Sequence, residues 1–291
     1  MSRLVAAGRA VLRRWRRFSQ RRVSGEVRSL RWWDVAVVGV VLFGLPVYSS
    51  MVAFVASRRE SADSGVSVFD DGADFGPQEN IAALVQQAGL LVAGAGYLGI
   101  RGVGSGGWSL RPTVRGSALG VGMFVAVGLV YDVLSWLYSG VFAQEESISE
   151  DAVVGAQGDE VSWWRAQFGH IDGSLLLYSV LNGFYEEFFF LGMCAAVEPE
   201  FRRPVFFSSL ALRGSIHTYQ GFFVSAFFGM VLGPAFYGIY AREGERDLYP
   251  LVFAHVLADI FGVSALGLFF RNLTRSAFRG GSWSKRFLFE L

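Results

Sequence analysis

Residues 182 to 192 read Asn182-Gly183-Phe184-Tyr185-Glu186-Glu187-Phe188-Phe189-Phe190-Leu191-Gly192, with two adjacent carboxylates inside an apolar run. The run extends over 174–197, and a helix of ~20 residues is enough to cross a bilayer. A charged side chain at that depth costs roughly 3 kcal/mol on insertion scales. Two neighbouring carboxylates there need protons, cationic partners, a metal ion or a wet cavity. We expect the rest of the chain to be the scaffold that supplies those partners.

The composition is that of a membrane protein. The 291-residue chain is 52% hydrophobic and 18% charged, whereas a soluble domain has about a quarter of its residues charged. It holds 36 glycines, 27 phenylalanines and 8 tryptophans, and membrane helices and their interfaces favour glycine and aromatic residues. We therefore predict an all-α, polytopic membrane helix bundle. Cys194 is the only cysteine, which excludes an intrachain disulfide and a cysteine metal cluster.

Seven apolar segments are predicted in the bundle, which gives about 7–8 transmembrane helices. They cover 32–56, 81–100, 116–142, 174–197, a segment from 204 onward, 221–240 and 250–270. Seven full spans would leave the basic C-terminal tail outside, against the rule that basic segments stay inside. Arg213 and His217 interrupt the fifth segment, so we expect a half-length or re-entrant helix there. Pro234 is expected to kink the sixth segment.

The arginine distribution divides and orients the chain. Residues 1–31 carry ten arginines and a single acid, with apolar residues at helical spacing. This pattern predicts a basic amphipathic arm lying on anionic lipid, and no nucleic-acid recognition module accompanies it. A transmembrane domain over 32–271 and a basic tail over 272–291 follow. We expect an integral protein of a bacterial plasma membrane with a cytoplasmic N-terminus.

Two of the later segments carry pairs of ionisable residues at membrane depth. Arg213 and His217 are four residues apart, and so are His255 and Asp259. Residues with this spacing share one face of a helix. Polar faces in a membrane bundle turn inward, so we expect both pairs to converge on one site between the last four segments.

The glutamates complete the predicted site. Glu186 and Glu187 are adjacent, so their side chains point about 100° apart on a helix and can have different roles. Asn182 lies one turn before Glu186 and is expected to support the site. Asp132, inside the third segment, is expected either to support the site residues or to line a cavity.

These residue types allow more than one chemistry. Two carboxylates and two imidazoles are suited to activating a water molecule. Glu186, His217 and His255 could instead hold Zn²⁺ with an open water position. A proton- or ion-coupled transporter would also use such groups. The chain has no His-Glu-x-x-His and no Gly-x-Ser-x-Gly sequence, so zincin and serine-hydrolase sites are not indicated.

Taken in order, the motifs resemble those of the CPBP family of intramembrane proteases. This family includes the eukaryotic CAAX prenyl protease 2 and bacterial Abi or bacteriocin-immunity proteins. Its pattern is Glu-Glu-x-x-x-Arg, then Phe-x-x-x-His, then His-x-x-x-Asn or Asp, each on a membrane helix. The resemblance covers roughly 174–263, with Glu186-Glu187, His217 and His255-Val256-Leu257-Ala258-Asp259.

Two positions depart from the family pattern. Leu191 stands where the first motif has arginine, and Arg213 stands where the second motif has phenylalanine. An arginine lost from one helix thus reappears one turn before the histidine of the next. We expect the two changes to compensate, with Arg213 pairing with one of the two glutamates, and we predict Glu187 as its partner.

The resemblance implies an intramembrane endopeptidase acting on a membrane-associated peptide or a prenylated protein C-terminus. Glu186 with His217 would deprotonate the attacking water, and His255, oriented by Asp259, would stabilise the oxyanion. Glu187 would be a structural partner or share the proton. No cofactor would be required in glutamate chemistry, whereas the Zn²⁺ alternative uses the same residues. Some relatives act in immunity or regulation, so a non-catalytic member is a further alternative.

Overall fold

The computed structural model describes residues 30–64, 76–103, 108–142, 168–242 and 247–268. This part of the chain is all-α, as predicted, and contains eight α-helices. The predicted basic arm, apart from its last two residues, and the predicted C-terminal tail lie outside the described residues.

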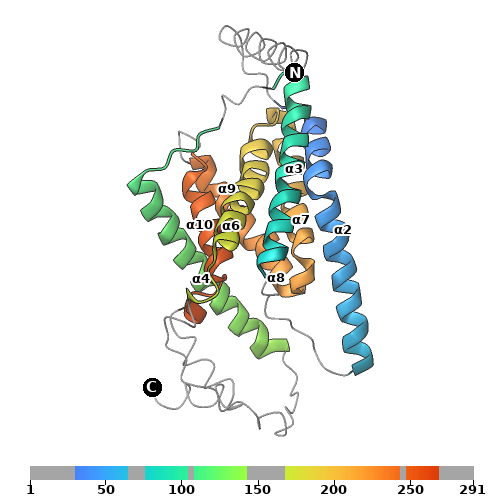
Figure 1. Ribbon diagram of the computed structural model, residues 1–291, viewed down its shortest axis with the longest axis vertical. Coiled ribbons are helices and arrows are strands. Elements are labelled where there is room, and N and C mark those ends of the chain that lie inside the picture. The colour runs from blue at the N-terminus through green and yellow to red at the C-terminus, as the bar shows by residue number, and fades with distance from the viewer. Residues whose placement is uncertain (1–29, 65–75, 104–107, 143–167, 243–246, 269–291) are drawn as a thin grey trace, which may run out of the picture.

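The helices follow one another in a bundle (Figure 1). In chain order they are α2 (Trp32–Ser64), α3 (Pro77–Arg101), α4 (Val114–Phe142), α6 (Gly173–Glu187), η3 (Phe188–Met193), η4 (Pro199–Phe201), α7 (Arg202–Ile216), η5 (Thr218–Gln220), α8 (Phe222–Ala226), η6 (Phe227–Leu232), α9 (Gly233–Arg242) and α10 (Tyr249–Phe261). The segments η3 and η6 are π-helical, and η4 and η5 are 3₁₀-helical. Every apolar segment predicted from the sequence contains helix.

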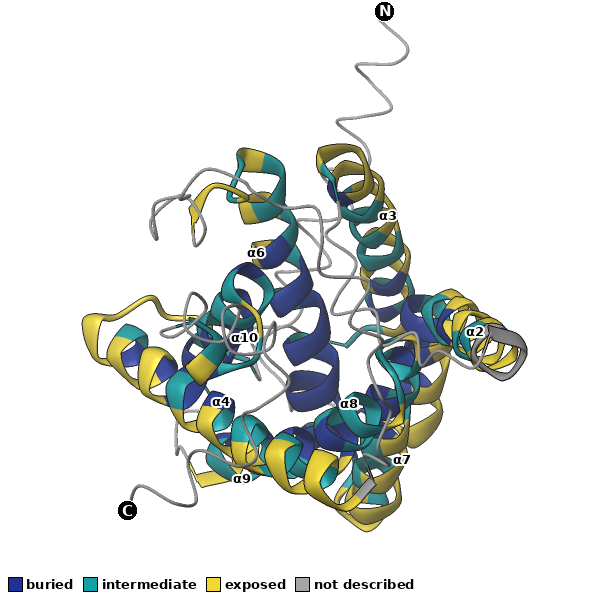
Figure 2. Cartoon of the chain, turned by 90° about the horizontal axis from the view of Figure 1, so that it is seen from below, coloured by how far each residue is buried: buried dark blue, intermediate teal, exposed yellow. Residues whose placement is uncertain are grey.

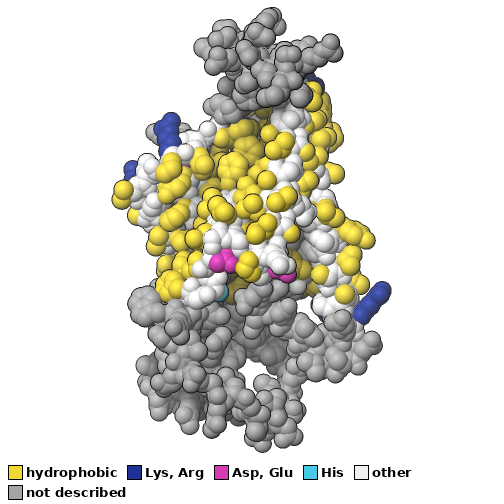
Figure 3. Space-filling model, viewed as in Figure 1, with side chains coloured by type: hydrophobic (Ala, Val, Ile, Leu, Met, Phe, Trp, Pro, Cys, Tyr) yellow, Lys and Arg dark blue, Asp and Glu magenta, His cyan; other side chains and the backbone are white. Residues whose placement is uncertain are grey.

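Four helical segments are long and apolar enough to cross a membrane, namely Trp32–Arg59, Pro77–Arg101, Val114–Val141 and Phe222–Arg242. Hydrophobic side chains cover much of the described surface in Figure 3, as expected of helices that face lipid. The chain is therefore an integral, polytopic helical membrane protein. The helix α7 has 15 residues and is only about 22 Å long, less than the ~30 Å hydrocarbon core. The short helix expected around Arg213 is thus present.

The helix α6 and its continuation η3 form the centre of the bundle. Figure 2 shows the buried central helix surrounded by the others. One apolar cluster joins η3 to α4, α9 and α10 through Leu191. A second cluster joins the opposite face of η3 to α2 and α3 through Phe189. The polar residues in the second half of α6, namely Ser179, Asn182, Glu186 and Glu187, are consequently buried.

The start of α6 and its approach to α10 are both set by small or polar residues. The Asp172 carboxylate accepts hydrogen bonds from Ser174 Oγ and from the backbone N–H of Leu175, at 2.6 and 2.8 Å. These bonds lower the pKa of Asp172 and cap the helix. At Gly183, a Cβ atom would lie 3.1 Å from both Val252 O and Val256 Cγ2. Glycine therefore allows α10 to lie directly against α6.

The two π-helical turns lie near the polar centre of the bundle. The turn η3 follows Glu187 directly, and Trp108 Nε1 donates a 2.7 Å hydrogen bond to the Gly192 carbonyl at its end. The turn η6 ends just before Gly233 and Pro234. Proline lacks the N–H that a regular helix requires, and the π-helical turn directly precedes it; the kink expected at Pro234 stays a prediction. Such turns frequently occur at functional sites.

Candidate active site

Glu187 is the hub of a buried polar cluster. Its Oε2 accepts a hydrogen bond from Arg213 Nη2 and its Oε1 lies against His255 Nδ1, both at 2.7 Å. The Glu187 side chain is fully buried. These contacts join α6, α7 and α10, and they confirm the predicted pairing of Arg213 with Glu187.

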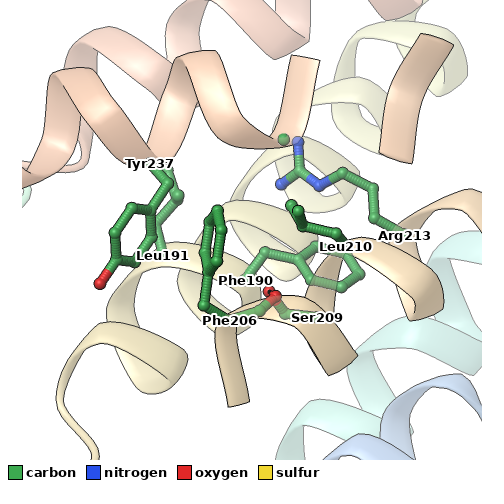
Figure 4. A pocket seen from close by; sticks show the side chains of 8 residues that line it. Phe190, Leu191, Phe206, Ser209, Leu210, Arg213 and Tyr237 are labelled. Carbon is green, nitrogen blue, oxygen red and sulfur yellow. Dashed lines mark hydrogen bonds between the residues drawn. The ribbon is translucent and has the colours of Figure 1, made fainter. Parts of the chain in front are cut away.

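Arg213 lies near Leu191, the position at which the family pattern has arginine. Its guanidinium lies 4.5 Å from the centre of the Phe190 ring, an arrangement in which the aromatic face attracts the cation. Arg213 and Leu191 line the same cavity of about 10 Å³ (Figure 4), which is enough for about one water molecule. Among the described residues, Arg213 Nη1 has no hydrogen-bond partner. The two departures from the family pattern thus meet in space.

Glu186 and His217 face each other without a hydrogen bond. His217 Nε2 lies 3.8 Å from Glu186 Oε2, which is beyond hydrogen-bond distance. Within the described part of the chain, Glu186 Oε2 and both ring nitrogens of His217 are buried and have no hydrogen-bond partner. The His217 ring stacks on Phe228 of η6, with 4.2 Å between ring centres. Stacking thus holds the His217 ring, while the facing polar atoms have no protein partner in the described part of the chain.

Asp259 belongs to the same cluster, but its direct partner is Asn182. Asn182 Nδ2 donates to Asp259 Oδ2 at 2.9 Å, and Gln87 Nε2 of α3 donates to Asn182 Oδ1 at 2.7 Å. Asp259 Oδ1 lies 3.6 Å from His255 Nε2. The 2.7 Å contact of the imidazole is with Glu187, and Asp259 is a more distant ion-pair neighbour of His255, so the orienting role of Asp259 stays a prediction.

The cluster has a closed side and a more accessible side. The side chains of Glu187 and Arg213 are 0% and 2% exposed, whereas those of His217 and Asp259 are 13% and 19% exposed. Any molecule that reaches the cluster would therefore meet His217 and Asp259 before the buried ion pair.

Asp132 does not join the cluster. Its Oδ2 accepts a 2.8 Å hydrogen bond from the backbone N–H of Leu266, in the segment after α10. This contact gives no support to the expected role beside the site residues, and the alternative that Asp132 lines a cavity stays a prediction. An intramembrane carboxylate has two ways to find a partner, and the sequence does not distinguish a side chain from a free backbone N–H.

The predicted metal ligands do not form a metal site in this arrangement. The described residues contain no group of three or more His, Cys, Asp or Glu side chains placed to hold a metal ion. Nδ1 of His255 is hydrogen-bonded to the Glu187 carboxylate. The Glu186 and His217 side chains face each other. The described residues are therefore not placed as a three-ligand metal site, although the Glu187 contact leaves Nε2 of His255 free.

Three residues outside the predicted set contact the site residues or the turn next to His217. Gln87 holds Asn182, Phe228 stacks on His217, and Ser50 of α2 contacts the turn after His217. A glutamine in the middle of an apolar segment is a signal that could have identified Gln87, because polar groups at that depth need partners. A serine or phenylalanine in a membrane helix gives no comparable signal.

The fold and the cluster define a helical membrane protein with a buried, partly unpaired set of carboxylates and imidazoles. Residues 173–261 match the family described as type II CAAX prenyl endopeptidase, Rce1-like. The resemblance drawn from the motifs is thereby confirmed for this segment, which contains every member of the cluster from α6, α7 and α10. The match covers less than half of the chain. No curated protein and no solved structure matches the chain. The family match implies a CAAX-type membrane protease with a protein or peptide substrate.

Proposed function

We propose that the protein is an intramembrane endopeptidase that hydrolyses a peptide bond in a membrane-associated peptide or protein. The family match supports this reaction class, since the matched family is one of endopeptidases. The cluster supports it chemically, because a buried carboxylate beside an imidazole is suited to general-base activation of water.

The observation that carries the proposal is the facing pair Glu186 and His217. With 3.8 Å between Glu186 Oε2 and His217 Nε2, one water oxygen can lie within hydrogen-bond distance of both atoms. Neither atom has another partner among the described residues. In a purely structural ion pair we would expect the two groups to bond directly, as Arg213 and Glu187 do.

The other members of the cluster would prepare His255 as a hydrogen-bond donor. Glu187 accepts a hydrogen bond from Nδ1 of the imidazole, which fixes the ring, and donation from Nε2 as well requires the imidazolium form. His255 Nε2 then points toward Asp259 and Asn182, at 3.6 and 3.5 Å. An oxyanion formed beside this nitrogen would accept its proton in a hydrogen bond, and such a bond strengthens as the negative charge develops.

The reaction would proceed in two balanced steps. Glu186, with His217 orienting the water, takes one proton as the water oxygen bonds to the scissile carbonyl carbon. The carbonyl oxygen becomes an oxyanion that accepts a hydrogen bond from His255 Nε2. The tetrahedral intermediate then breaks its C–N bond, and the leaving amine receives the proton held by Glu186. The products are a carboxylic acid and an amine, and the glutamate returns to its starting state.

The proposed topology places this site among the last four membrane segments of about seven. These are α6 with η3, α7, the continuous stretch α8–η6–α9, and α10. The transmembrane domain would cover 32–271, with the basic arm and tail on either side. Substrate would reach the cluster from the bilayer, on the side of His217 and Asp259, where the cluster is most exposed.

The test is peptide cleavage by the purified protein in detergent. The substrate panel contains membrane-spanning peptides and a prenylated C-terminal peptide, each assayed with and without a chelator. Glu186→Gln should lower kcat by about 10²-fold or more, because general-base catalysis contributes at least that much. Glu200→Gln, an exposed carboxylate in η4, is the matched control and should cleave like the wild type. Equal cleavage by Glu186→Gln and the wild type would contradict the proposal. Loss of cleavage with chelator would favour the Zn²⁺ alternative over glutamate chemistry.

A further inference from the structure

Ser50 is a buried polar residue of α2 that contacts the turn following His217. Its Oγ lies 2.9 Å from Thr218 Oγ1 and accepts a hydrogen bond from the backbone N–H of Tyr219, also at 2.9 Å. Ser50 is 4% exposed. It lies outside the segment 173–261 that matches the endopeptidase family, so the family pattern gives it no role.

The direction of each hydrogen bond in this contact can be deduced. Thr218 Oγ1 donates its only proton to the Ser215 carbonyl, at 3.0 Å. Ser50 must therefore donate to Thr218 Oγ1, since a hydroxyl has one donor and two acceptor positions. The order runs from Tyr219 N–H to Ser50, from Ser50 to Thr218, and from Thr218 to Ser215. In this series of hydrogen bonds, the hydroxyls of Ser50 and Thr218 each donate one bond and accept one.

These bonds hold the chain on both sides of His217. Ser215 precedes the histidine, and Thr218 and Tyr219 follow it in η5. The histidine itself ends α7, with its own N–H donating to the Gly214 carbonyl. Its ring nitrogens have no hydrogen-bond partner in the described part of the chain, so the backbone and the stacking on Phe228 set their position.

We propose that Ser50 is a positioning residue, which acts through the turn to hold His217 opposite Glu186. The inference rests on the proposed function for its catalytic consequence, while the anchoring itself does not depend on it. A displacement of about 1 Å in a reacting group can cost 10²-fold in rate. A side chain that fixes the His217 turn from another helix would therefore affect turnover without touching the substrate.

The experiment compares Ser50→Ala with Ser49→Ala. Ser49 is exposed, and its Oγ bonds only the Pro46 carbonyl of its own helix, so the control removes the same atom without affecting the turn. Ser50→Ala should lower kcat about tenfold with KM unchanged, the cost of one lost buried hydrogen bond. Ser49→Ala should match the wild type. A change in KM alone, or an equal loss in both variants, would overturn the assignment.

A double variant tests whether the hydroxyls act as one unit. Thr218→Val removes the middle hydroxyl with little change in shape, and it should lower kcat about as much as Ser50→Ala. The double variant Ser50→Ala with Thr218→Val should then be no slower than either single variant, because residues of one network are not additive. Fully additive losses would contradict the shared chain of hydrogen bonds.

Amide hydrogen exchange separates the anchoring from the proposed reaction. In Ser50→Ala, a peptide containing Tyr219 should exchange faster, because its N–H loses its acceptor, while Ser49→Ala should leave exchange unchanged. Unchanged exchange in Ser50→Ala would overturn the inference whether or not the protein cleaves peptides. If the wild type cleaves nothing, the proposed function fails, and the exchange result alone decides whether Ser50 anchors the turn.

Discussion

At the scale of single residues, two neighbouring glutamates have opposite surroundings. Both oxygens of Glu187 have partners, Arg213 and His255. Glu186 Oε2 has no partner among the described residues and lies 3.8 Å from His217. The difference follows from their separation around the helix, which turns one carboxylate toward α7 and α10 and the other toward the start of η5. We infer that the first organises the site and the second carries the chemistry.

The buried arginine provides a direct test of compensation between two positions. Restoring the family pattern requires two substitutions, Arg213→Phe and Leu191→Arg, at residues that line the same cavity. Arg213→Phe alone should destabilise the protein by about 3–5 kcal/mol, because it leaves Glu187 buried without its cationic partner. Adding Leu191→Arg should recover most of that loss. The measurement is the temperature at which half the detergent-solubilised protein loses its folded state.

The single variant Leu191→Arg is the control for this pair. It adds a second buried cation beside Arg213 and should also be destabilising. Each single variant is thus expected to be less stable than the double variant. If the double variant were as unstable as the sum of the two singles, Arg213 would not be replacing the arginine of the family pattern.

The sequence predicts which polar residues belong together better than it predicts how they bond. Residues four apart on a helix share a face, and this placed Arg213, His217, His255 and Asp259 in one site. The spacing does not say which imidazole nitrogen faces which carboxylate, so Glu187 was missed as the partner of His255. The contacts of Gln87 and Ser50 span 95 and 168 residues of sequence, and no local pattern indicates them.

At the scale of elements, the central helix depends on its close approach to α10. Hydropathy predicts that α6 and α10 exist, but the distance between them depends on which side chains are missing at their contact. Gly183 lies next to Asn182 and one turn before Glu187, and α10 supplies His255 and Asp259. The helix pair therefore has to stay close for the cluster to form.

Gly183→Ala should disrupt this approach. The new methyl group would lie 3.1 Å from the Val252 carbonyl and from Val256 Cγ2, and overpacking of this kind costs about 1–3 kcal/mol. We expect a lower unfolding temperature in detergent. We also expect kcat to fall by more than the fraction of folded protein does. Gly89→Ala is the control, since nothing lies within 4 Å of a Cβ atom there. Alanine should stabilise α3 slightly at that position, so equal effects of the two changes would contradict the packing argument.

The π-helical turns are the part of the secondary structure that hydropathy could not supply. The turn η3 contains three phenylalanines and has the composition of an ordinary apolar helix. Its extra residue changes the direction of the side chains that follow it, while Leu191 and Phe189 face different apolar clusters because they are two residues apart on the helix. The sequence predicted a kink at Pro234, but it predicted neither π-helical turn.

At the scale of the whole molecule, one end of the bundle is tied together by contacts between distant segments. Leu30 pairs with Val197, and Ser109 pairs with Asp247, as isolated β-bridges. Asp34 accepts hydrogen bonds from Tyr97 and Arg101 across α2 and α3. Most described arginines belong to segments that begin or end here: Arg31, Arg101, Arg111, Arg115, Arg202, Arg203 and Arg242. By the positive-inside rule this end should face the cytoplasm.

Cysteine labelling can test that orientation. Cys194 is the only cysteine and is buried, so background labelling should be low. Pro112→Cys lies exposed at the arginine-rich end, and Gly173→Cys lies exposed at the start of α6, on the opposite end. A membrane-impermeant maleimide should label Gly173→Cys in intact cells and Pro112→Cys only after permeabilisation. The reverse pattern would mean that the N-terminus lies outside.

The hydrogen bonds from α2 and α3 bear on how such a protein can be inherited. The matched stretch, 173–261, does not contain two of its hydrogen-bond partners. Gln87 and Ser50 belong to the earlier helices α3 and α2. A segment exchanged between genes brings only its own side chains. Transplanted alone, this one would carry an unsupported Asn182 and an unanchored turn beside His217. The matched stretch therefore depends on α2 and α3 for two of its polar contacts, and a transplanted segment would need equivalent partners in its new setting.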